Sequence, residues 1–396
     1  MQIYVDNAAT TKMSKTAIDA MLPYMDEVYG NPSSLHSVGQ KANEILEDAR
    51  ERIAKCIGCE AREITFTSGG SESDNQAIIS AAAIGKRKGK NKIISTAFEH
   101  HAVLHTLDKL KKEGFEIVLL DVSESGFVTP QQVADAIDDN TCLVTVMFAN
   151  NEIGTIQPIE EIGKICREKG VIFHTDAVQA VGHIEVDVKK QNIDMLSLSA
   201  HKFYGPKGVG VLYAKKGIPL TNIINGGAQE RGKRAGTENI PAIMGMTAAL
   251  EDAIKNMAEN SKKITALRDR LIDGLLKIEH SVLNGDRNNR LPGNVNFCFE
   301  AVEGESLLLL LDDKGIYASS GSACTSGSLD PSHVLLAIGR PHEIAHGSLR
   351  LSLSEETTAE EIDYIIESVT NVIAYLRSIS PVWRDLQEGK SKFVIK

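Results

Sequence analysis

One cysteine in this 396-residue sequence lies where a reactive thiol is plausible. Cys324 is in the run "ASSGSACTSGSLDPSHV" (318–334), which is rich in serine and glycine. These residues favour turns and flexibility and add little apolar area, so a core position for Cys324 is not expected. Two interpretations stay open at this point: an incidental surface cysteine, or a reactive thiol whose partners lie elsewhere in the chain.

A lysine and an aspartate follow two apolar runs that are typical of strands. Lys202 comes in "SLSAHKFYGPKGVGVLYA", beside Ser199 and His201, and Asp176 ends the run "VIFHTD". A lysine beside hydroxyl and imidazole donors can form a Schiff base with an aldehyde cofactor, although an ordinary surface lysine is the alternative. A carboxylate in such a site keeps a pyridinium nitrogen protonated. The pair therefore indicates a cofactor with both groups.

A glycine-rich turn supplies a candidate anion site. The segment "EITFTSGGSESDNQAII" (63–79) passes from a strand pattern through Gly69, Gly70 and Ser71 into a helix pattern. Backbone N–H groups and the helix dipole favour an anion at such a terminus. The segment matches neither the dinucleotide nor the nucleoside-triphosphate glycine motif, so a phosphate of another cofactor is the functional interpretation and a structural turn is the alternative.

The elements around these residues alternate between short β-rich runs and helical stretches. Such alternation predicts an α/β protein with a mostly parallel sheet covered on both faces, whose ligands gather at the carboxyl ends of its strands. The expected strands are 92–96, 115–121, 142–149, 170–176, 194–200 and 208–214.

The second part of the chain has a different pattern. A long helical stretch runs from Pro241 to about Ile278, and it is followed by short strands and helices that are typical of a smaller α+β unit. We expect residues 13–255 to form a large cofactor-binding domain. Residues 1–12 and 256–396 are expected to form a small domain that carries the cysteine loop.

The composition argues against a nucleic-acid-binding, membrane or disulfide-rich protein. Lys plus Arg is 43 and Asp plus Glu is 53, so the formal net charge is −10, which argues against nucleic acid as a ligand. The longest apolar run (306–313) is far short of the ~20 residues that span a bilayer, and the first residues lack a basic signal-peptide region. Six irregularly spaced cysteines do not form a disulfide framework. These features predict a cytoplasmic protein that does not enter a membrane.

Nine motifs, taken in their order along the chain, resemble those of the cysteine desulfurases, which are pyridoxal-phosphate enzymes of the class V aminotransferase type. They run from the N-terminus to about Arg350: "YVDNAATT", "GNPSSLHSVG", "TSGGSESDN", "EHHAV", "NNEIGTIQP", "HTDAVQAVG", "SAHKFYGPKGVG", "RAGTEN" and "SSGSACTSG". The resemblance implies the aspartate aminotransferase-like fold of pyridoxal-phosphate-dependent transferases. That fold has a mostly parallel seven-stranded-type sheet and a smaller α+β domain.

The resemblance also implies a cofactor site for pyridoxal 5'-phosphate. Lys202 would carry the cofactor covalently, Asp176 would pair with the pyridine nitrogen, and His101 would stack on the ring and move protons. Asn151 and Gln179 would contact the phenolic oxygen of the ring or the carboxylate side of the substrate. The phosphate would be held by Gly70, Ser71, Ser199 and His201, with Thr237 reaching it from a second subunit, so a homodimer is implied.

The implied activity converts L-cysteine to L-alanine and leaves the sulfur on Cys324 as a persulfide. Arg350, together with Asn151, would bind the substrate, because a guanidinium fork suits a carboxylate. The length of the cysteine loop resembles long-loop members that hand sulfur to iron–sulfur scaffold proteins or other acceptors, and an iron–sulfur cluster is expected to bind Cys324 only transiently.

Two further motifs and the C-terminal tail have structural interpretations. "HEIAH" (342–346) matches a zinc pattern, but Pro341 and Gly347 leave barely one helical turn, so no metal is expected. Cys56 and Cys59 have ligand spacing without a second pair, and packing is favoured for them. The tail with Trp383 either docks a partner or frays. A selenocysteine lyase, an aminotransferase and a non-catalytic scaffold remain as alternative functions.

Overall fold

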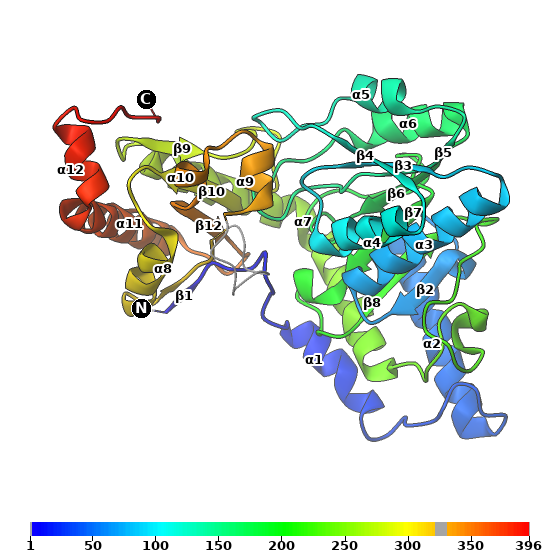
Figure 1. The fold of residues 1–396 in the computed structure, drawn as a ribbon. Coiled ribbons are helices and arrows are strands. Elements are labelled where there is room, and N and C mark those ends of the chain that lie inside the picture. The colour runs from blue at the N-terminus through cyan, green and yellow to red at the C-terminus, as the bar shows by residue number, and fades with distance from the viewer. Residues whose placement is uncertain (1, 321–330, 396) are drawn as a thin grey trace.

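The computed structural model describes residues 2–320 and 331–395. Figure 1 shows two lobes, with the strands of a large sheet in one and both chain ends in the other. The strands are β1 (Ile3–Tyr4), β2 (Ile64–Thr67), β3 (Lys92–Thr96), β4 (Glu116–Leu120), β5 (Thr141–Thr145), β6 (Ile172–Asp176), β7 (Met195–Ser199), β8 (Gly210–Ala214), β9 (Ser281–Leu283), β10 (Asn294–Phe299), β11 (Ile316–Tyr317) and β12 (Ser348–Ser352). The helices are α1 (Lys15–Met21), α2 (Ser37–Cys56), α3 (Gly70–Arg87), α4 (His101–Lys112), α5 (Pro130–Ala136), α6 (Ile159–Lys169), α7 (Ile240–Leu275), α8 (Gly304–Asp313), α9 (His333–Ala337), α10 (His342–Ala345), α11 (Ala359–Ile379) and α12 (Pro381–Gln387).

The large sheet has seven strands in the order β2-β8-β7-β6-β5-β3-β4. Strand β8 runs antiparallel to both of its neighbours, and the remaining pairs are parallel. Every residue of β5, β7 and β8 is buried, as expected for strands that helices cover on both faces. The predicted α/β class, the mostly parallel sheet and all six predicted strands are confirmed.

Two apolar layers sandwich this sheet. On one face Ile78 of α3 and Leu107 of α4 pack with Leu143, Met195 and Leu212 of the strands. On the other face a larger cluster joins the sheet to α2, α6 and α7. Local signals fix the ends of these helices: α6 stops at Gly170, whose positive φ of 64° suits a residue without a Cβ.

The second lobe is the predicted smaller α+β unit. Its three-stranded sheet has the order β12-β10-β9 and is antiparallel, and β1 pairs with β11 in a separate parallel ribbon. Helices α8 and α11 cover this unit, and α11 begins with a reciprocal capping box between Thr358 and Glu361. Strand β12 carries Arg350 toward the other lobe.

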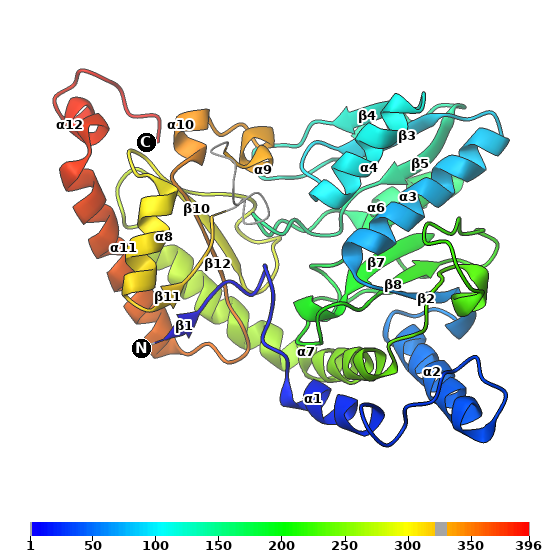
Figure 2. The same cartoon turned by 60° about the horizontal axis from the view of Figure 1, so that its bottom comes forward.

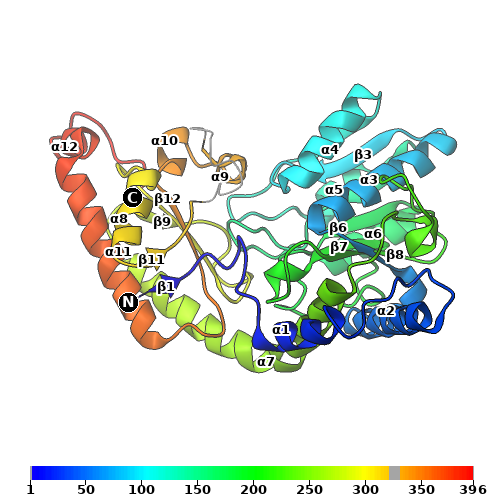
Figure 3. The same ribbon diagram turned by 90° about the horizontal axis from the view of Figure 1, so that it is seen from below.

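Helix α7 links the two lobes, as Figures 2 and 3 show. Its first half buries Met246 and Leu250 in the core of the large sheet, and its second half buries Leu271 and Leu275 in the core of the smaller unit. The change of core falls after Ala253 and before Ile264. The predicted domain boundary at 255/256 lies in this stretch, and its position stays a prediction.

The C-terminal tail packs against the smaller lobe. The guanidinium of Arg377 lies 4.1 Å from the ring centre of Trp383, and the rings of His280 and Phe393 stack at 3.7 Å. Both carboxylate oxygens of Glu300 accept hydrogen bonds from the backbone of residues 394 and 395. The described part of the tail is therefore held in place. Within residues 2–320 and 331–395, no helix combines the length and the apolarity that crossing a membrane requires.

Candidate active site

A cavity of about 330 Å³ opens at the carboxyl ends of β6 and β7. This volume is at the lower end of the ~300–1,000 Å³ typical of small-ligand sites. Nine of the predicted site residues line it: Gly70, Ser71, Asn151, Asp176, Gln179, Ser199, His201, Lys202 and Arg350. As expected, side chains at the carboxyl ends of the strands come together in one cavity.

Lys202 ends a short 3-10 turn, Ala200–Lys202, directly after β7. Its Nζ donates hydrogen bonds to the carbonyl oxygens of Ala8 (2.6 Å) and Ala9 (2.7 Å), which belong to the N-terminal segment. The backbone carbonyl of Lys202 is bonded to Nε2 of His183 at 2.8 Å. Backbone and ammonium group are thus both fixed, with the amine on the cavity wall.

Asp176 is the last residue of β6 and is almost fully buried. Burial raises the pKa of its carboxyl to about 6, while the N–H of Val178 and the charge of Lys202 act in the opposite direction. Oδ1 accepts the Val178 N–H at 2.9 Å. A buried carboxylate without a bound cation is costly, so this position is suited to a ligand that brings a positive N–H group.

A second buried carboxyl, that of Asp74 on α3, lines the same cavity. Its pKa lies well above the usual range, first because of burial and then because of the nearby charge of Asp176. His174 Nε2 lies 3.6 Å from Asp74 Oδ1, and burial holds the pKa of that imidazole down to about 3. Asp74 is therefore the neutral member of the two carboxyls, which leaves the negative charge to Asp176.

The turn between β2 and α3 forms the predicted anion cradle. Gly69 has a φ of 152°, a conformation that other residues rarely adopt. A Cβ on Gly70 would lie 2.6 Å from Cγ2 of Val178, so only glycine leaves this approach open. The first N–H groups of α3 point out of its N-terminus, and Ser71, Ser199 and His201 add side-chain donors. Together with Lys202 and Asp176, this cradle fits a ligand with an aldehyde, a pyridine ring and a phosphate.

Among the described residues, the histidines that line the cavity are His100 and His201; His101, the histidine predicted to stack on the cofactor ring, is not one of them. His100 precedes α4 and caps it, with Nδ1 accepting the Ala102 N–H at 3.1 Å. Burial and the charge of Lys202 lower its pKa to about 4, so the ring is neutral and Nε2 carries its proton. His101 is the first residue of the helix, and its ring contacts His105 and His333 at 5.0 and 4.6 Å instead.

Arg350 brings a buried guanidinium from β12, with an exposed fraction of 2%. Nη2 pairs with Oδ1 of Asp6 at 2.9 Å, and Nη1 donates to the backbone oxygen of Asn151 at 3.2 Å. Among the described residues, Nε has no hydrogen-bond partner. This donor suits a ligand carboxylate. Asn151 and Gln179 lie beside it, and Nε2 of Gln179 holds the Ala8 carbonyl at 3.0 Å.

Thr237 does not line this cavity. Thr237 is exposed and lines a separate cavity with Phe66 and Glu230, and the carboxylate of Glu230 is held by two hydrogen bonds of 2.8 Å from Arg50. Cys324 lies outside the described residues. Its place relative to the cavity is therefore a prediction from sequence alone.

The five cysteines in the described ranges are poor nucleophiles. Burial raises the pKa of every one of them, to about 11 or 12: Cys56, Cys59, Cys142, Cys166 and Cys298. The thiolate is the reactive form, so these residues are almost entirely in the unreactive form near neutral pH. The packing role favoured for Cys56 and Cys59 agrees with this chemistry.

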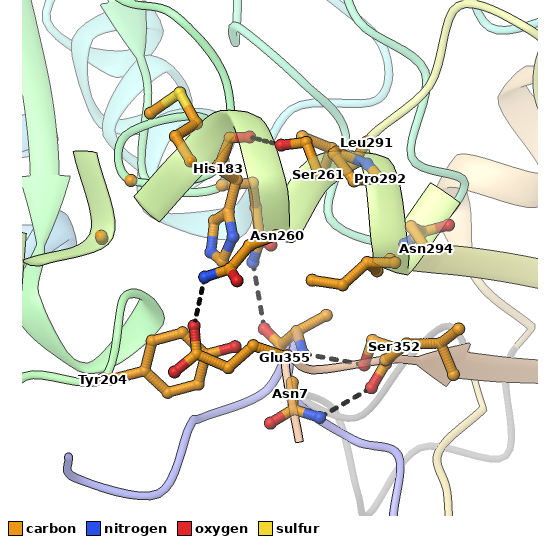
Figure 4. A pocket seen from close by; sticks show the side chains of 18 residues that line it. Asn7, His183, Tyr204, Asn260, Ser261, Leu291, Pro292, Asn294, Ser352 and Glu355 are labelled. Atoms are coloured by element: carbon orange, nitrogen blue, oxygen red, sulfur yellow. Dashed lines mark hydrogen bonds between the residues drawn. The ribbon is translucent and has the colours of Figure 1, made fainter. Parts of the chain in front are cut away.

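A second cavity lies behind the site, between the two lobes, and is drawn in Figure 4. It shares Ala8 and Gln179 with the first cavity. Ser261 of α7 donates to the backbone oxygen of His183 at 3.2 Å, and His183 in turn holds the Lys202 backbone. The helix that links the lobes is therefore connected to the lysine through one histidine.

Comparison with known proteins gives consistent results. The family model for "Aminotransferase class-V" matches residues 3–365. The chain is 55% identical over 394 residues to the cysteine desulfurase IscS of Clostridium botulinum strain Hall, with 99% of both chains covered. It is 54% identical over 380 residues to the IscS of Methanosarcina thermophila, covering 96% of this chain and 94% of that one. A solved structure titled "NIFS-LIKE PROTEIN" is similar with a TM-score of 0.89 and 38% identity, covering 95% of this chain and 100% of the other.

Proposed function

This chain belongs to the class V aminotransferase family, and we propose that it is a cysteine desulfurase that uses pyridoxal 5'-phosphate. The observation that carries the proposal is the single cavity lined by Lys202, Asp176 and Arg350. An amine, a buried carboxylate and a carboxylate-binding guanidinium together suit a pyridine-aldehyde cofactor and an amino-acid substrate.

The cofactor would be held by groups on four segments: the start of α3, the residue before α4, the end of β6 and the turn after β7. Lys202 Nζ would supply the covalent attachment, Asp176 would pair with the ring nitrogen, and His100 would contact the ring as a neutral imidazole. Ser71 and His201 belong to the phosphate cradle. When bound, the cofactor withdraws electrons from the α-carbon of an amino acid, which makes its proton removable.

The residues of this chain position the substrate and handle its proton. Arg350 would take the carboxylate of cysteine through Nε, which has no hydrogen-bond partner among the described residues, while Nη1 and Nη2 each hold one protein oxygen. The Nζ of Lys202, on the cavity wall, would act as the base that takes the α-proton. Its hydrogen bonds to the carbonyl oxygens of Ala8 and Ala9 hold the neutral or the charged amine in place.

Cys324 is proposed as the sulfur acceptor. Its thiolate attacks the substrate sulfur, the C–S bond breaks with its electron pair on the β-carbon, and that carbon takes up a proton, so that cysteine leaves as alanine. A persulfide remains on Cys324. The raised pKa of all five described cysteines supports this choice.

We further infer that the persulfide is delivered to an iron–sulfur scaffold protein or another sulfur acceptor in the cytoplasm. A persulfide needs a reducing compartment in which it is passed on and not oxidised. The six relatives with the names IscS and NifS at 47–55% identity support an acceptor of this class.

The experiment that tests the function measures both products. Protein loaded with pyridoxal phosphate is incubated with L-cysteine and a reductant, and alanine and sulfide are assayed together. A desulfurase forms them in equal amounts. Formation of pyruvate without release of sulfide would favour an aminotransferase, as would exchange with keto acids in a variant that lacks Cys324. Release of selenide from selenocysteine, with no sulfide from cysteine, would favour a selenocysteine lyase.

Replacing Asp176 with asparagine should slow α-proton removal far more than it weakens cofactor binding. The amide oxygen of asparagine still accepts the Val178 N–H, so the turn after β6 is retained. The negative charge that keeps the ring nitrogen protonated is lost, and a rate loss of about 10²-fold is expected for such a charge. Exchange of the α-proton of cysteine with deuterated solvent measures this step, and absorbance measures bound cofactor. Exchange at the parent's rate would contradict the role of Asp176.

We propose that the enzyme is a homodimer in which Thr237 reaches the partner's phosphate cradle. Thr237 is exposed and outside the cavity of its own chain, and an apolar surface near the N-terminus includes Met25 (64% exposed), Tyr29 (78%) and Leu35 (91%). Large apolar side chains that are exposed in a single chain and close together in sequence support an interface at this segment.

Met25→Asp combined with Leu35→Asp should convert a sedimenting dimer into a monomer that retains less cofactor. Leu309→Asp is the matched control, because Leu309 is similarly exposed (71%) but lies on α8 in the smaller lobe. A parent that sediments as a monomer with full activity would refute the proposed dimer.

A further inference from the structure

Ser332 and His333, near the end of the cysteine-bearing segment, are bound to the large lobe by their side chains. Ser332 Oγ donates a short hydrogen bond to Oε2 of Glu152, and Nε2 of His333 donates to the backbone oxygen of Glu99 at 2.9 Å. Both acceptors are neighbours in sequence of residues that line the active-site cavity, Asn151 and His100. The start of α9 is therefore attached to the wall of the cavity at two points.

The proton and both lone pairs of the Ser332 hydroxyl are used in hydrogen bonds. Its oxygen accepts the N–H groups of Val334 at 3.1 Å and Leu335 at 3.3 Å, which caps α9. A hydroxyl has one proton and two lone pairs, so the proton is directed to Glu152 and nowhere else. Ser332 is 4% exposed, so water does not replace this contact.

The backbone of Glu152 is held in place by hydrogen bonds on both sides. Its backbone N–H is held by Oδ1 of Asn150 at 2.8 Å, and its backbone oxygen accepts from Asn294 at 3.2 Å and Asn296 at 3.1 Å on β10. The side chain is fully buried, and burial raises its pKa to about 7, with the charge of Arg350 acting in the opposite direction. Burying a carboxyl is costly, and in the described part of the chain the side chain of Glu152 accepts one hydrogen bond, from Ser332.

The other end of the same segment is attached to the substrate-binding strand. The backbone of Ser319 and that of Arg350 exchange two hydrogen bonds, of 3.2 and 2.6 Å. The guanidinium of Arg350 also donates to the backbone of Asn151, the residue before Glu152. The residues that flank Cys324 on both sides are thus connected to one set of groups around the substrate carboxylate.

We propose that Ser332 and Glu152 are positioning residues for the sulfur-transfer step: their contact fixes the chain eight residues after Cys324 to the pocket wall. This inference rests on the proposed function. That reaction has two stages, α-proton removal and sulfur transfer, and the inference assigns Ser332 and Glu152 to the second. α-Proton removal requires only groups of the cavity, whereas transfer to Cys324 also requires that the thiol arrive in the correct position. Misplacement by about 1 Å can lower a rate by about 10²-fold.

Ser332→Ala separates the two stages. We expect formation of alanine and of the Cys324 persulfide to fall by about 10-fold to 10²-fold, while exchange of the α-proton of cysteine stays within about twofold of the parent. Ser332→Thr, which retains the hydroxyl, should restore transfer. Glu152→Met removes the acceptor but leaves Ser332 to cap α9, so it should reproduce the selective loss.

A readout independent of turnover completes the experiment. In the full-length protein, the rate at which iodoacetamide alkylates Cys324 should be the same in parent and Ser332→Ala within about twofold, because the thiol itself is unchanged. Ser380→Ala is the matched control, since Ser380 caps α12 through the Trp383 N–H and has no carboxylate partner. It should leave both stages unaffected.

Two outcomes would overturn the inference. Equal loss of α-proton exchange and sulfur transfer in Ser332→Ala and Glu152→Met would make the contact generally structural, and full transfer in both variants would make it dispensable. If the parent exchanges the α-proton but forms no alanine, the proposed function fails, and the inference fails with it.

Discussion

Replacing Cys324 with serine should leave a folded, coloured enzyme that binds cysteine but forms almost no alanine or sulfide. The groups proposed to bind cofactor and substrate belong to described residues of the cavity, and serine differs from cysteine by one atom, so binding and α-proton exchange should continue. The serine oxygen does not accept sulfur as a persulfide, and its hydroxyl is not ionised near neutral pH. We expect alanine formation to fall by about 10³-fold or more.

Cys59→Ser is the matched control for this variant. The pKa of the Cys59 thiol is raised to about 12 by burial, so it should contribute nothing to turnover, and its replacement should leave the rate within about twofold of the parent. Rapid mixing with cysteine followed by assay of alanine distinguishes the variants. A Cys324→Ser protein that desulfurates at the parent's rate would exclude Cys324 as the acceptor.

Replacing Lys202 with alanine should abolish covalent attachment of the cofactor and lower turnover by about 10³-fold or more. Lys202 is the lysine whose Nζ lines the cavity at the end of β7, and alanine supplies neither the amine for attachment nor a base for the α-proton. The phosphate cradle is unchanged, so noncovalent binding should remain. Borohydride reduction followed by peptide mapping should label the parent and spare the variant.

Lys207→Ala is the control for the loss of a lysine from the same turn. Lys207 is exposed and lines a different cavity, so its variant should retain both label and turnover. Label on any lysine other than Lys202 in the parent would contradict the assignment.

The strands of the large sheet were predictable because they are short, rich in apolar residues and bounded by turn signals. Strands β5 and β7 are buried at every residue, their threonine and serine side chains included, as expected where helices cover both faces of a sheet. Strand ends then locate Asp176 and Lys202, since parallel strands place their carboxyl ends along one edge of the sheet. These two residues are the part of the site that depends least on distant contacts.

The histidine of the site was not resolved from sequence because two histidines stand side by side. The apolar spacing of Val103, Leu107 and Leu110 marks the helix but leaves its first residue uncertain by one position. His100 caps α4 and so precedes the helix, which makes His101 its first residue. Histidine is not among the residues that usually cap helices, so the sequence carries no signal for this boundary.

Contacts between distant parts of the chain have no local signal. The Ser332–Glu152 contact joins residues 180 positions apart, and the pair Arg350–Asp6 joins residues 344 apart. Asp74 looks like an ordinary polar residue on α3 until the sheet places it beside Asp176. The role proposed for Thr237 requires a second copy of the chain, and the sequence around Thr237 carries no signal of such a contact.

The central claim is that Cys324 receives the sulfur of the substrate, and mass spectrometry tests it most directly. The parent, loaded with cofactor, is treated with one equivalent of L-cysteine without reductant, alkylated and digested with trypsin. The peptide 315–350 contains Cys324 as its only cysteine, and the peptide 56–62 contains Cys56 and Cys59. Our account predicts one added sulfur atom on peptide 315–350, in an amount equal to the alanine formed. Sulfur on peptide 56–62, or alanine formed with no sulfur on peptide 315–350, would contradict it.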